Sequence, residues 1–234
     1  MSEWWTYSPS DFLLFSARTY YRLLEIHNAE SWPAHALTLA VGLVILVLVH
    51  RDAAWRGRAI SGAMAALWAW VAWSFLWNRY STINWAARYA ALVFGIEALL
   101  LVWQGVVRGR LDFRVDASRR SVVAMTLFAT SLTYPLLLTL FGRDWREVEV
   151  FGITADPTVV ATLGLLLVPA RRRWSTLIIP MLWCALSAGT LWLLDAPESW
   201  LLIAVLLVTI IGLSLKSPDL RNQQQPLRDH AAAQ

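Results

Sequence analysis

The sequence predicts an all-α membrane protein: a polytopic bundle of seven transmembrane helices, preceded by an amphipathic helix at the outer interface. Three observations lead to this fold class. Seven apolar segments follow one another along the chain, charged residues are scarce, and the connecting loops alternate between many and few arginines. A bilayer core about 30 Å thick needs about 20 apolar residues in a helix. We therefore expect nearly the whole chain to lie in a membrane.

The composition supports this class. Hydrophobic residues make up 58% of the 234 residues and charged residues only 15%, whereas a soluble domain has about 25% charged residues. The net charge of +4 does not indicate nucleic acid, because the basic side chains gather at the ends of apolar segments, as in membrane proteins. The single cysteine, Cys184, excludes an intrachain disulfide and a cysteine metal cluster.

Residues 1–33 form the first predicted unit, an external amphipathic segment. A helix is expected over Ser10–Asn28, because at 100° per residue its polar and apolar side chains separate onto opposite arcs. The polar arc holds Asp11, Arg18, Arg22 and Glu25, and the apolar arc holds Phe12, Leu13, Tyr20, Leu23 and Leu24. Such a helix lies flat at the membrane surface.

Residues 34–216 form the predicted seven-helix transmembrane domain, and residues 217–234 a flexible cytoplasmic tail. The apolar segments are His35–Val49, Ala59–Trp77, Trp85–Val107, Val122–Phe141, Pro157–Ala170, Leu177–Leu194 and Trp200–Leu215. The fifth is the weakest, since it covers only about 21 Å at 1.5 Å per residue. We expect a short span with Asp156 as N-cap and Pro157 at the first helical position. The alternative is a re-entrant hairpin.

The basic residues predict the orientation. Of the 20 lysines and arginines, 14 fall in the C-terminal tail and in the loops after segments one, three and five, and 6 fall on the other side. Cytoplasmic loops of membrane proteins carry the excess of Lys and Arg. We expect the N-terminus outside the membrane and the C-terminus in the cytoplasm.

Glu97 is the strongest single candidate for a buried polar site. It lies near the centre of the third segment, where an ionised side chain costs several kcal/mol unless it is paired, protonated or hydrated. Counting equal depth along the neighbouring segments gives its expected partners, Thr130, Ser131, Tyr134 and Ser187. Two interpretations stay open: a proton or ligand site, and a structural hydrogen bond that holds two helices together.

A second candidate site lies at the outer face. It combines the polar arc of the first helix with an arginine at the outer end of the third segment: Asp11, Arg18, Arg22, Glu25 and Arg88. The functional interpretation is a site for an anion or a lipid headgroup, and the alternative is anchoring of the outer loops. No catalytic residue, cofactor or metal ligand is assigned, because nucleophile, phosphate-loop and metal motifs are all missing from the sequence.

Several short stretches resemble an uncharacterised bacterial family of multi-pass membrane proteins, filed as a domain of unknown function, some of whose members are labelled permease-like. The stretches are Trp5–Tyr7, Ser10–Ser16, Arg18–Leu23, Tyr80 and Ile83–Ala87. Ala17 departs from the family, whose members tend to have proline there. The resemblance implies a fold and a location in the bacterial inner (plasma) membrane, and it assigns no catalytic residue.

Together these observations favour a permease or sensor for a small solute or ion that uses the outer half of the bundle. The alternative is a non-catalytic accessory or scaffold subunit of a membrane complex. An intramembrane enzyme ranks third. The expected partners are the lipid bilayer and either other membrane subunits or further copies of the chain, and nucleic acid is not expected.

Overall fold

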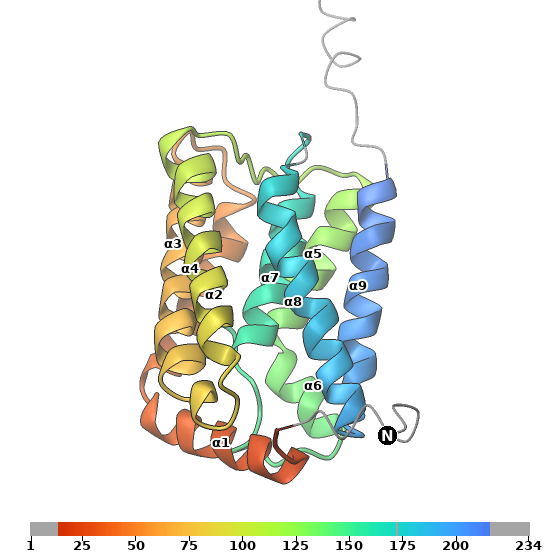
Figure 1. Cartoon of the computed structure of the whole chain (residues 1–234). Helices are drawn as coiled ribbons and strands as arrows, with labels where there is room; N and C mark the ends of the chain where they lie inside the picture. The colour runs from red at the N-terminus through yellow and green to blue at the C-terminus, as the bar shows by residue number, and fades with distance from the viewer. Residues whose placement is uncertain (1–13, 172, 216–234) are drawn as a thin grey trace, which may run out of the picture.

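The computed structural model describes residues 14–171 and 173–215, and these residues are helical, with no strand among them. The α-helices are α1 (Ala17–Glu30), α2 (Ala34–Leu48), α3 (Arg56–Val71), α4 (Ala87–Leu101), α5 (Arg119–Leu132), α6 (Tyr134–Leu140), α7 (Ala155–Leu167), α8 (Trp174–Leu193) and α9 (Ser199–Ser214). Two π-helical turns, η3 (Ala72–Trp77) and η5 (Val102–Val107), extend α3 and α4, and a 3-10 turn, η4 (Tyr80–Thr82), follows η3. Helices α2 to α5 and α7 to α9 run side by side, and α1 lies across one end of the bundle (Figure 1). The short helix α6 is bent by 71° from α5.

Three helical stretches are long and apolar enough to cross a membrane: Arg56–Thr82, Ala87–Val107 and Trp174–Leu193. The number rises to five if each of two sharply bent pairs, α1 with α2 and α5 with α6, counts as one span. Helices α7 and α9 are apolar but shorter. All seven predicted apolar segments therefore form helices, but only three to five reach the length expected of a span.

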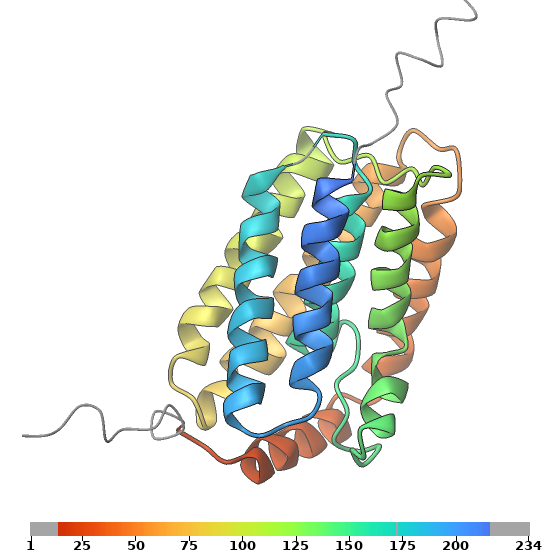
Figure 2. The same ribbon diagram turned by 90° about the vertical axis from the view of Figure 1, so that its right-hand side faces the viewer.

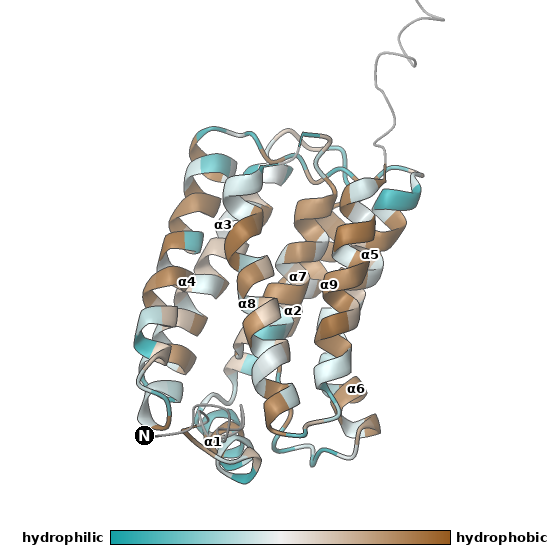
Figure 3. Ribbon diagram, turned by 45° about the vertical axis from the view of Figure 1, so that its right-hand side comes forward, coloured by the Kyte–Doolittle hydropathy of each residue, from teal (hydrophilic) through white to brown (hydrophobic). Residues whose placement is uncertain are grey.

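The arginine-rich loops gather at the end of the bundle opposite α1. Consecutive long helices run in opposite directions, so the loops after α2, η5 and α7 meet at this end, where α9 also finishes (Figure 2). Colouring by hydropathy shows hydrophilic residues at the end loops and along α1, and hydrophobic residues along the helices between them (Figure 3). The three arginine-rich loops, which the sequence predicts to lie on one side, therefore lie at the same end of the bundle.

Helix α7 is the centre of the bundle, and every one of its residues is buried. It packs mainly against α5, α8 and α9. The closest approach is at Gly164, where a Cβ would lie 2.7 Å from the Ala124 carbonyl oxygen and 2.9 Å from the Phe128 amide nitrogen of α5. Only glycine lets the two backbones come so near.

A buried, non-helical loop leads into α7 and accounts for the shortness of that helix. Non-helical backbone is tolerated inside a bundle only where its polar groups find partners within the protein. Here the Thr154 hydroxyl accepts from the Val150 amide at 3.0 Å, and the Thr158 hydroxyl accepts from the Gly152 amide at 2.9 Å. Helix α7 then begins at Ala155 with Thr154 as N-cap. The prediction that Asp156 caps the helix with Pro157 first was therefore wrong.

Helix α1 is shorter at its start than the predicted Ser10–Asn28. Residues 10–13 lie outside the described part of the chain, and the helix begins only at Ala17, because the Ser16 hydroxyl caps it by accepting from the Thr19 amide at 3.3 Å. The bend between α1 and α2 is 87°. The buried face of α1 is Tyr20, Leu23, Leu24 and His27. The described members of the predicted apolar arc, Tyr20, Leu23 and Leu24, thus pack on the end of the bundle, and Phe12 and Leu13 lie outside the described residues.

Candidate functional site

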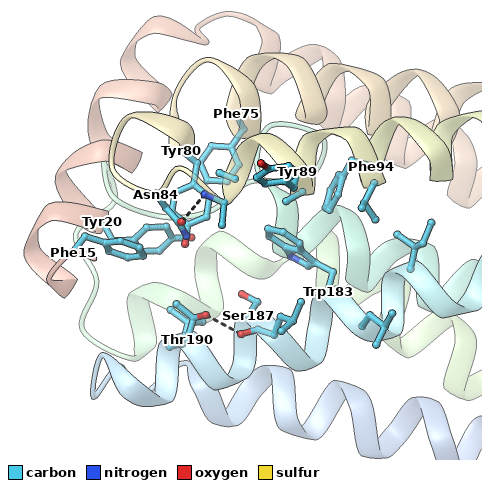
Figure 4. A pocket seen from close by; sticks show the side chains of 18 of the residues that line it. Phe15, Tyr20, Phe75, Tyr80, Asn84, Tyr89, Phe94, Trp183, Ser187 and Thr190 are labelled. Atoms are coloured by element: carbon cyan, nitrogen blue, oxygen red, sulfur yellow. Dashed lines mark hydrogen bonds between the residues drawn. The ribbon is translucent and has the colours of Figure 1, made fainter. Parts of the chain in front are cut away.

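A cavity of about 440 Å³ opens between α4 and α8, next to the start of α1. Figure 4 shows aromatic side chains from several elements around it. Phe75 and Tyr80 are stacked with ring centroids 5.8 Å apart, and Tyr80 meets Tyr20 edge-on at 5.7 Å. Farther along the cavity, Phe94 meets Trp183 edge-on at 4.8 Å. The cavity is therefore walled mainly by apolar and aromatic groups, as small-molecule sites usually are.

Three polar side chains in this wall donate to carboxyl groups that lie behind it. The Tyr20 hydroxyl donates to Glu149 at 2.9 Å. The Trp183 indole N–H and the Ser187 hydroxyl donate to the two oxygens of Asp156, at 2.8 Å and 2.7 Å. Glu149 and Asp156 are both only 2% exposed. Two buried carboxyls therefore stand directly behind the lining of the cavity.

A buried ion pair completes this acid cluster, which we define as Arg143, Glu149, Asp156 and Glu198. Arg143 and Glu198 are 2.7 Å apart. Tyr21 of α1 joins them, since its hydroxyl donates to Glu198 at 3.2 Å and its ring lies 3.4 Å from the Arg143 guanidinium carbon. The cluster contains three carboxyls and one guanidinium. The guanidinium pairs with Glu198, so Glu149 and Asp156 have no ion-pair partner within the cluster.

The electrostatics of Glu149 follow from this arrangement. Burial raises the pKa of Glu149 well above its ordinary value of 4.5, and the nearby Asp156 raises it further. Arg143 and the hydrogen bond from Tyr20 act in the opposite direction but do not offset the burial. A carboxyl in such surroundings favours its protonated form and exchanges a proton when its surroundings change.

The residues predicted around Glu97 are not brought together. Glu97 is fully buried, as expected for an acid in the middle of a helix bundle, but neither of its oxygens has a hydrogen-bond partner in the described structure. Helix α4 packs mainly on α3 and α8, whereas α5 packs on α7 and α9. Helix α4 and the next helix in the sequence, α5, therefore do not pack on each other, and equal depth along the two helices did not identify the partners of Glu97.

The predicted partners of Glu97 have other environments. The Ser131 hydroxyl donates within its own helix to the Phe128 carbonyl at 2.7 Å. Thr130 is only partly buried on α5. Tyr134 is buried with no hydrogen-bond partner for its hydroxyl in the described residues. Of the four, Ser187 belongs to the cavity wall and bonds Asp156 instead.

The predicted outer-face residues are also dispersed. Asp11 lies outside the described residues. Arg22 and Glu25 form an ion pair of 2.5 Å in which the arginine side chain is 66% exposed, and Arg18 is exposed. Arg88 lies 5.9 Å from the Trp77 ring centroid. These contacts are those of a solvated helix face and a loop anchor, and none of the described members lines the cavity.

The acid cluster was missed because its members lie in the loops between apolar segments, where acids ordinarily meet water. One signal was present in the sequence: Glu149 is flanked by Val148, Val150 and Phe151, an apolar setting for a loop carboxylate. In the described residues, no group of three or more histidine, cysteine, aspartate or glutamate side chains is arranged to hold a metal ion.

The fold and the cavity define a class: an all-α protein with at least three helices able to span a membrane and an apolar cavity backed by buried acids. The chain belongs to a family of unknown function, DUF6064, whose model matches residues 17–224. This match confirms the resemblance to an uncharacterised family. Comparisons with curated proteins and with solved structures find no match.

Proposed function

We propose that this chain is a multi-pass protein of the bacterial inner membrane, a permease or sensor that binds a small solute in the cavity between α4 and α8. The observation that carries the proposal is the position of two buried carboxyls, Glu149 and Asp156, directly behind the polar wall of that cavity. A ligand that displaces Tyr20 or Trp183 changes the hydrogen bonds of these acids, and thereby their affinity for a proton. Ligand binding and proton binding are then coupled.

The proposed topology has seven crossings, with α1 at the outer surface. It is supported by the arginine-rich loops, which share the end of the bundle opposite α1. The shortest crossing, α7, is enclosed on all sides by protein, so its length need not match the hydrocarbon thickness. A reporter active only in the periplasm, fused at the C-terminus, should be silent, whereas the same reporter fused after Phe141 should be active. The reverse pattern would overturn the topology.

The test of the function is native mass spectrometry of the full chain purified in mild detergent. Wild-type protein should retain a small molecule that is lost from the Asp156→Asn variant but kept by Asp144→Asn, which removes an exposed acid from the same end of the protein. If neither wild type nor variants retain a small molecule, and a second membrane protein is bound in fixed ratio, the permease or sensor proposal fails.

That second outcome would favour an accessory or scaffold subunit. One observation speaks for it: Trp70, Trp73 and Trp77 are 43%, 61% and 40% exposed, and at this spacing they share one face of the helix formed by α3 and η3. Such a face packs equally well on lipid and on another helix. Replacing all three by leucine should leave the chain folded and release the bound subunit if this alternative holds.

A further inference from the structure

We propose that the α4–α8 cavity takes an amphiphilic organic cation, an alkylammonium with its charged head against the aromatic wall and its chain along α8. This inference rests on the proposed function, because it assigns a ligand class to the same cavity. Two sources supply this chemistry, the headgroup of an aminolipid and a free amphiphilic amine. Both present an ammonium group on an apolar body.

The hydrogen bonds of the cavity wall indicate the charge of the ligand that the cavity would bind. Tyr20, Trp183 and Ser187 all use their hydrogens on the carboxyls behind them. The Tyr20 and Ser187 oxygens therefore keep only lone pairs for the cavity. A hydroxyl whose hydrogen is engaged can accept but not donate. Asn84 and Tyr89 also line the cavity and can donate, but the part of the wall formed by Tyr20 and Ser187 suits a ligand that donates hydrogen bonds or carries positive charge.

The aromatic rings act in the same direction. An ammonium group is attracted to the negative face of an aromatic ring within about 6 Å of its centroid. Phe15, Tyr20, Phe75 and Tyr80 form a continuous cluster at one end of the cavity, with neighbouring centroids 5.7 to 6.1 Å apart. Clusters of this kind bind ammonium ions by replacing their hydration with ring faces.

The described lining contains no competing cation. None of the described residues around the cavity is lysine, arginine or histidine, and the buried guanidinium of Arg143, in the acid cluster, is already paired with Glu198. Two acids, Glu149 and Asp156, remain behind the wall without such a pair. A cation in the cavity stabilises the ionised form of either carboxyl, whereas an anion opposes it, and such interactions are strong in a low-dielectric interior. The two acids therefore favour a cation in the cavity over an anion.

The mouth of the cavity suits an alkyl chain. Val93 on α4 and Leu182 and Leu186 on α8 line it and are 41%, 58% and 68% exposed. These side chains form an apolar path from the cavity to the outside of the bundle. A ligand can therefore leave its chain among lipid tails while its head reaches the aromatic cluster.

The test compares three probes that share one chain, octylammonium, octanol and octanoate, on the full chain in a non-ionic detergent. A ligand that binds only the native state raises the thermal unfolding midpoint with concentration. We expect octylammonium to raise the midpoint at concentrations at least tenfold below those at which octanol does, and octanoate to have no effect. A preference for octanoate, or equal effects of all three, would overturn the inference.

Two variants locate the effect. Asp156→Asn should weaken octylammonium binding at least tenfold and leave octanol unchanged, because it removes charge and keeps shape. Tyr80→Leu removes one ring face and should weaken the binding of octylammonium but not that of octanol. This variant replaces Asp156→Asn as the test if Asp156→Asn fails to fold. Asp144→Asn, an exposed acid at the same end, should change neither probe. If octylammonium acts equally on wild type and on both cavity variants, it binds elsewhere and the inference is wrong.

Measurements in nanodiscs distinguish the two sources of the ammonium group, an aminolipid and a free amine. If an aminolipid occupies the cavity, discs containing phosphatidylethanolamine should raise the midpoint over discs of phosphatidylglycerol alone and abolish the effect of octylammonium. If a free amine is the ligand, octylammonium should act equally in both discs. The proposed function fails separately: it falls if none of the three octyl probes binds the cavity, whereas equal binding of all three leaves a ligand site of another class.

Discussion

Replacing Arg143 by methionine should strongly destabilise the end of the bundle that α1 covers. The Arg143 and Glu198 side chains are only 5% and 2% exposed and lie 2.7 Å apart. Without the guanidinium, the Glu198 carboxylate stays buried with the Tyr21 hydroxyl as its remaining donor. Breaking a buried pair by removing one partner costs about 3–5 kcal/mol. We expect a loss of that size in the free energy of unfolding.

The assay is reversible unfolding by sodium dodecyl sulfate in mixed micelles, followed by tryptophan fluorescence. The double variant Arg143→Met with Glu198→Gln should recover most of the loss, because the carboxylate that has lost its guanidinium partner is then replaced by a neutral amide. Arg22→Met is the matched control: its partner is Glu25, but the Arg22 side chain is 66% exposed, and exposed pairs contribute about 0–1 kcal/mol. If Arg143→Met costs no more than Arg22→Met, the acid cluster does not hold α1 in place.

Three further predictions use the same unfolding assay. Burial raises the pKa of Glu149 above its ordinary value of 4.5, so the stability that this carboxyl contributes is complete below pH 4.5 and is lost as the pH rises through the raised pKa. Glu149→Gln should therefore flatten the decline of stability above pH 4.5, and an unchanged slope would assign the decline to other groups. The ionisable groups that face Glu149 are Tyr20, Arg143, Asp156 and Glu198. Gly164→Ala should lower the free energy of unfolding by about 1–3 kcal/mol, since its Cβ would lie 2.7 Å from a backbone oxygen of α5. Gly95→Ala is the control and should be neutral or slightly stabilising, because a Cβ there would have no atom within 4 Å. Equal effects of the two variants would mean that α5 and α7 do not cross at Gly164. Glu97→Leu should leave the free energy of unfolding unchanged or raise it. Asp156→Leu should lower it by about 1–3 kcal/mol for each hydrogen-bond donor, Trp183 or Ser187, that is left without an acceptor. A large loss of stability in Glu97→Leu would reveal a partner for that carboxyl.

The sequence predicts the positions of the helices well because their cause is local. Each apolar run is long enough to predict a helix, and most of the runs end beside charged residues or glycine. It does not predict that α7 is central. A helix that is apolar on all sides has the same sequence pattern whether protein or lipid surrounds it. The distinguishing features, such as the contact of Gly164 with α5, depend on segments distant in the sequence.

The candidate site was harder to predict, because its contacts join distant parts of the chain. Tyr20 and Glu149 are 129 residues apart, and Tyr21 and Glu198 are 177 apart. The sequence shows that α1 is amphipathic, but not which groups its buried face covers. Once α1 lies across the bundle end, acids that would otherwise meet water are enclosed, and their burial is a property of the assembled fold.

Glu97 and Asp156 show why a buried acid alone does not define a site. Both are buried on apolar helices, and the cost of a charge at such depth draws attention to either one. Asp156 receives hydrogen bonds from Trp183 and Ser187, two residues that also line the cavity, so a change in the cavity reaches this carboxyl directly. Glu97 has no hydrogen-bond partner in the described residues, so no such path leads to it. The same substitution to leucine should therefore have opposite signs at the two positions, and that difference measures how far each acid is integrated into the cavity wall.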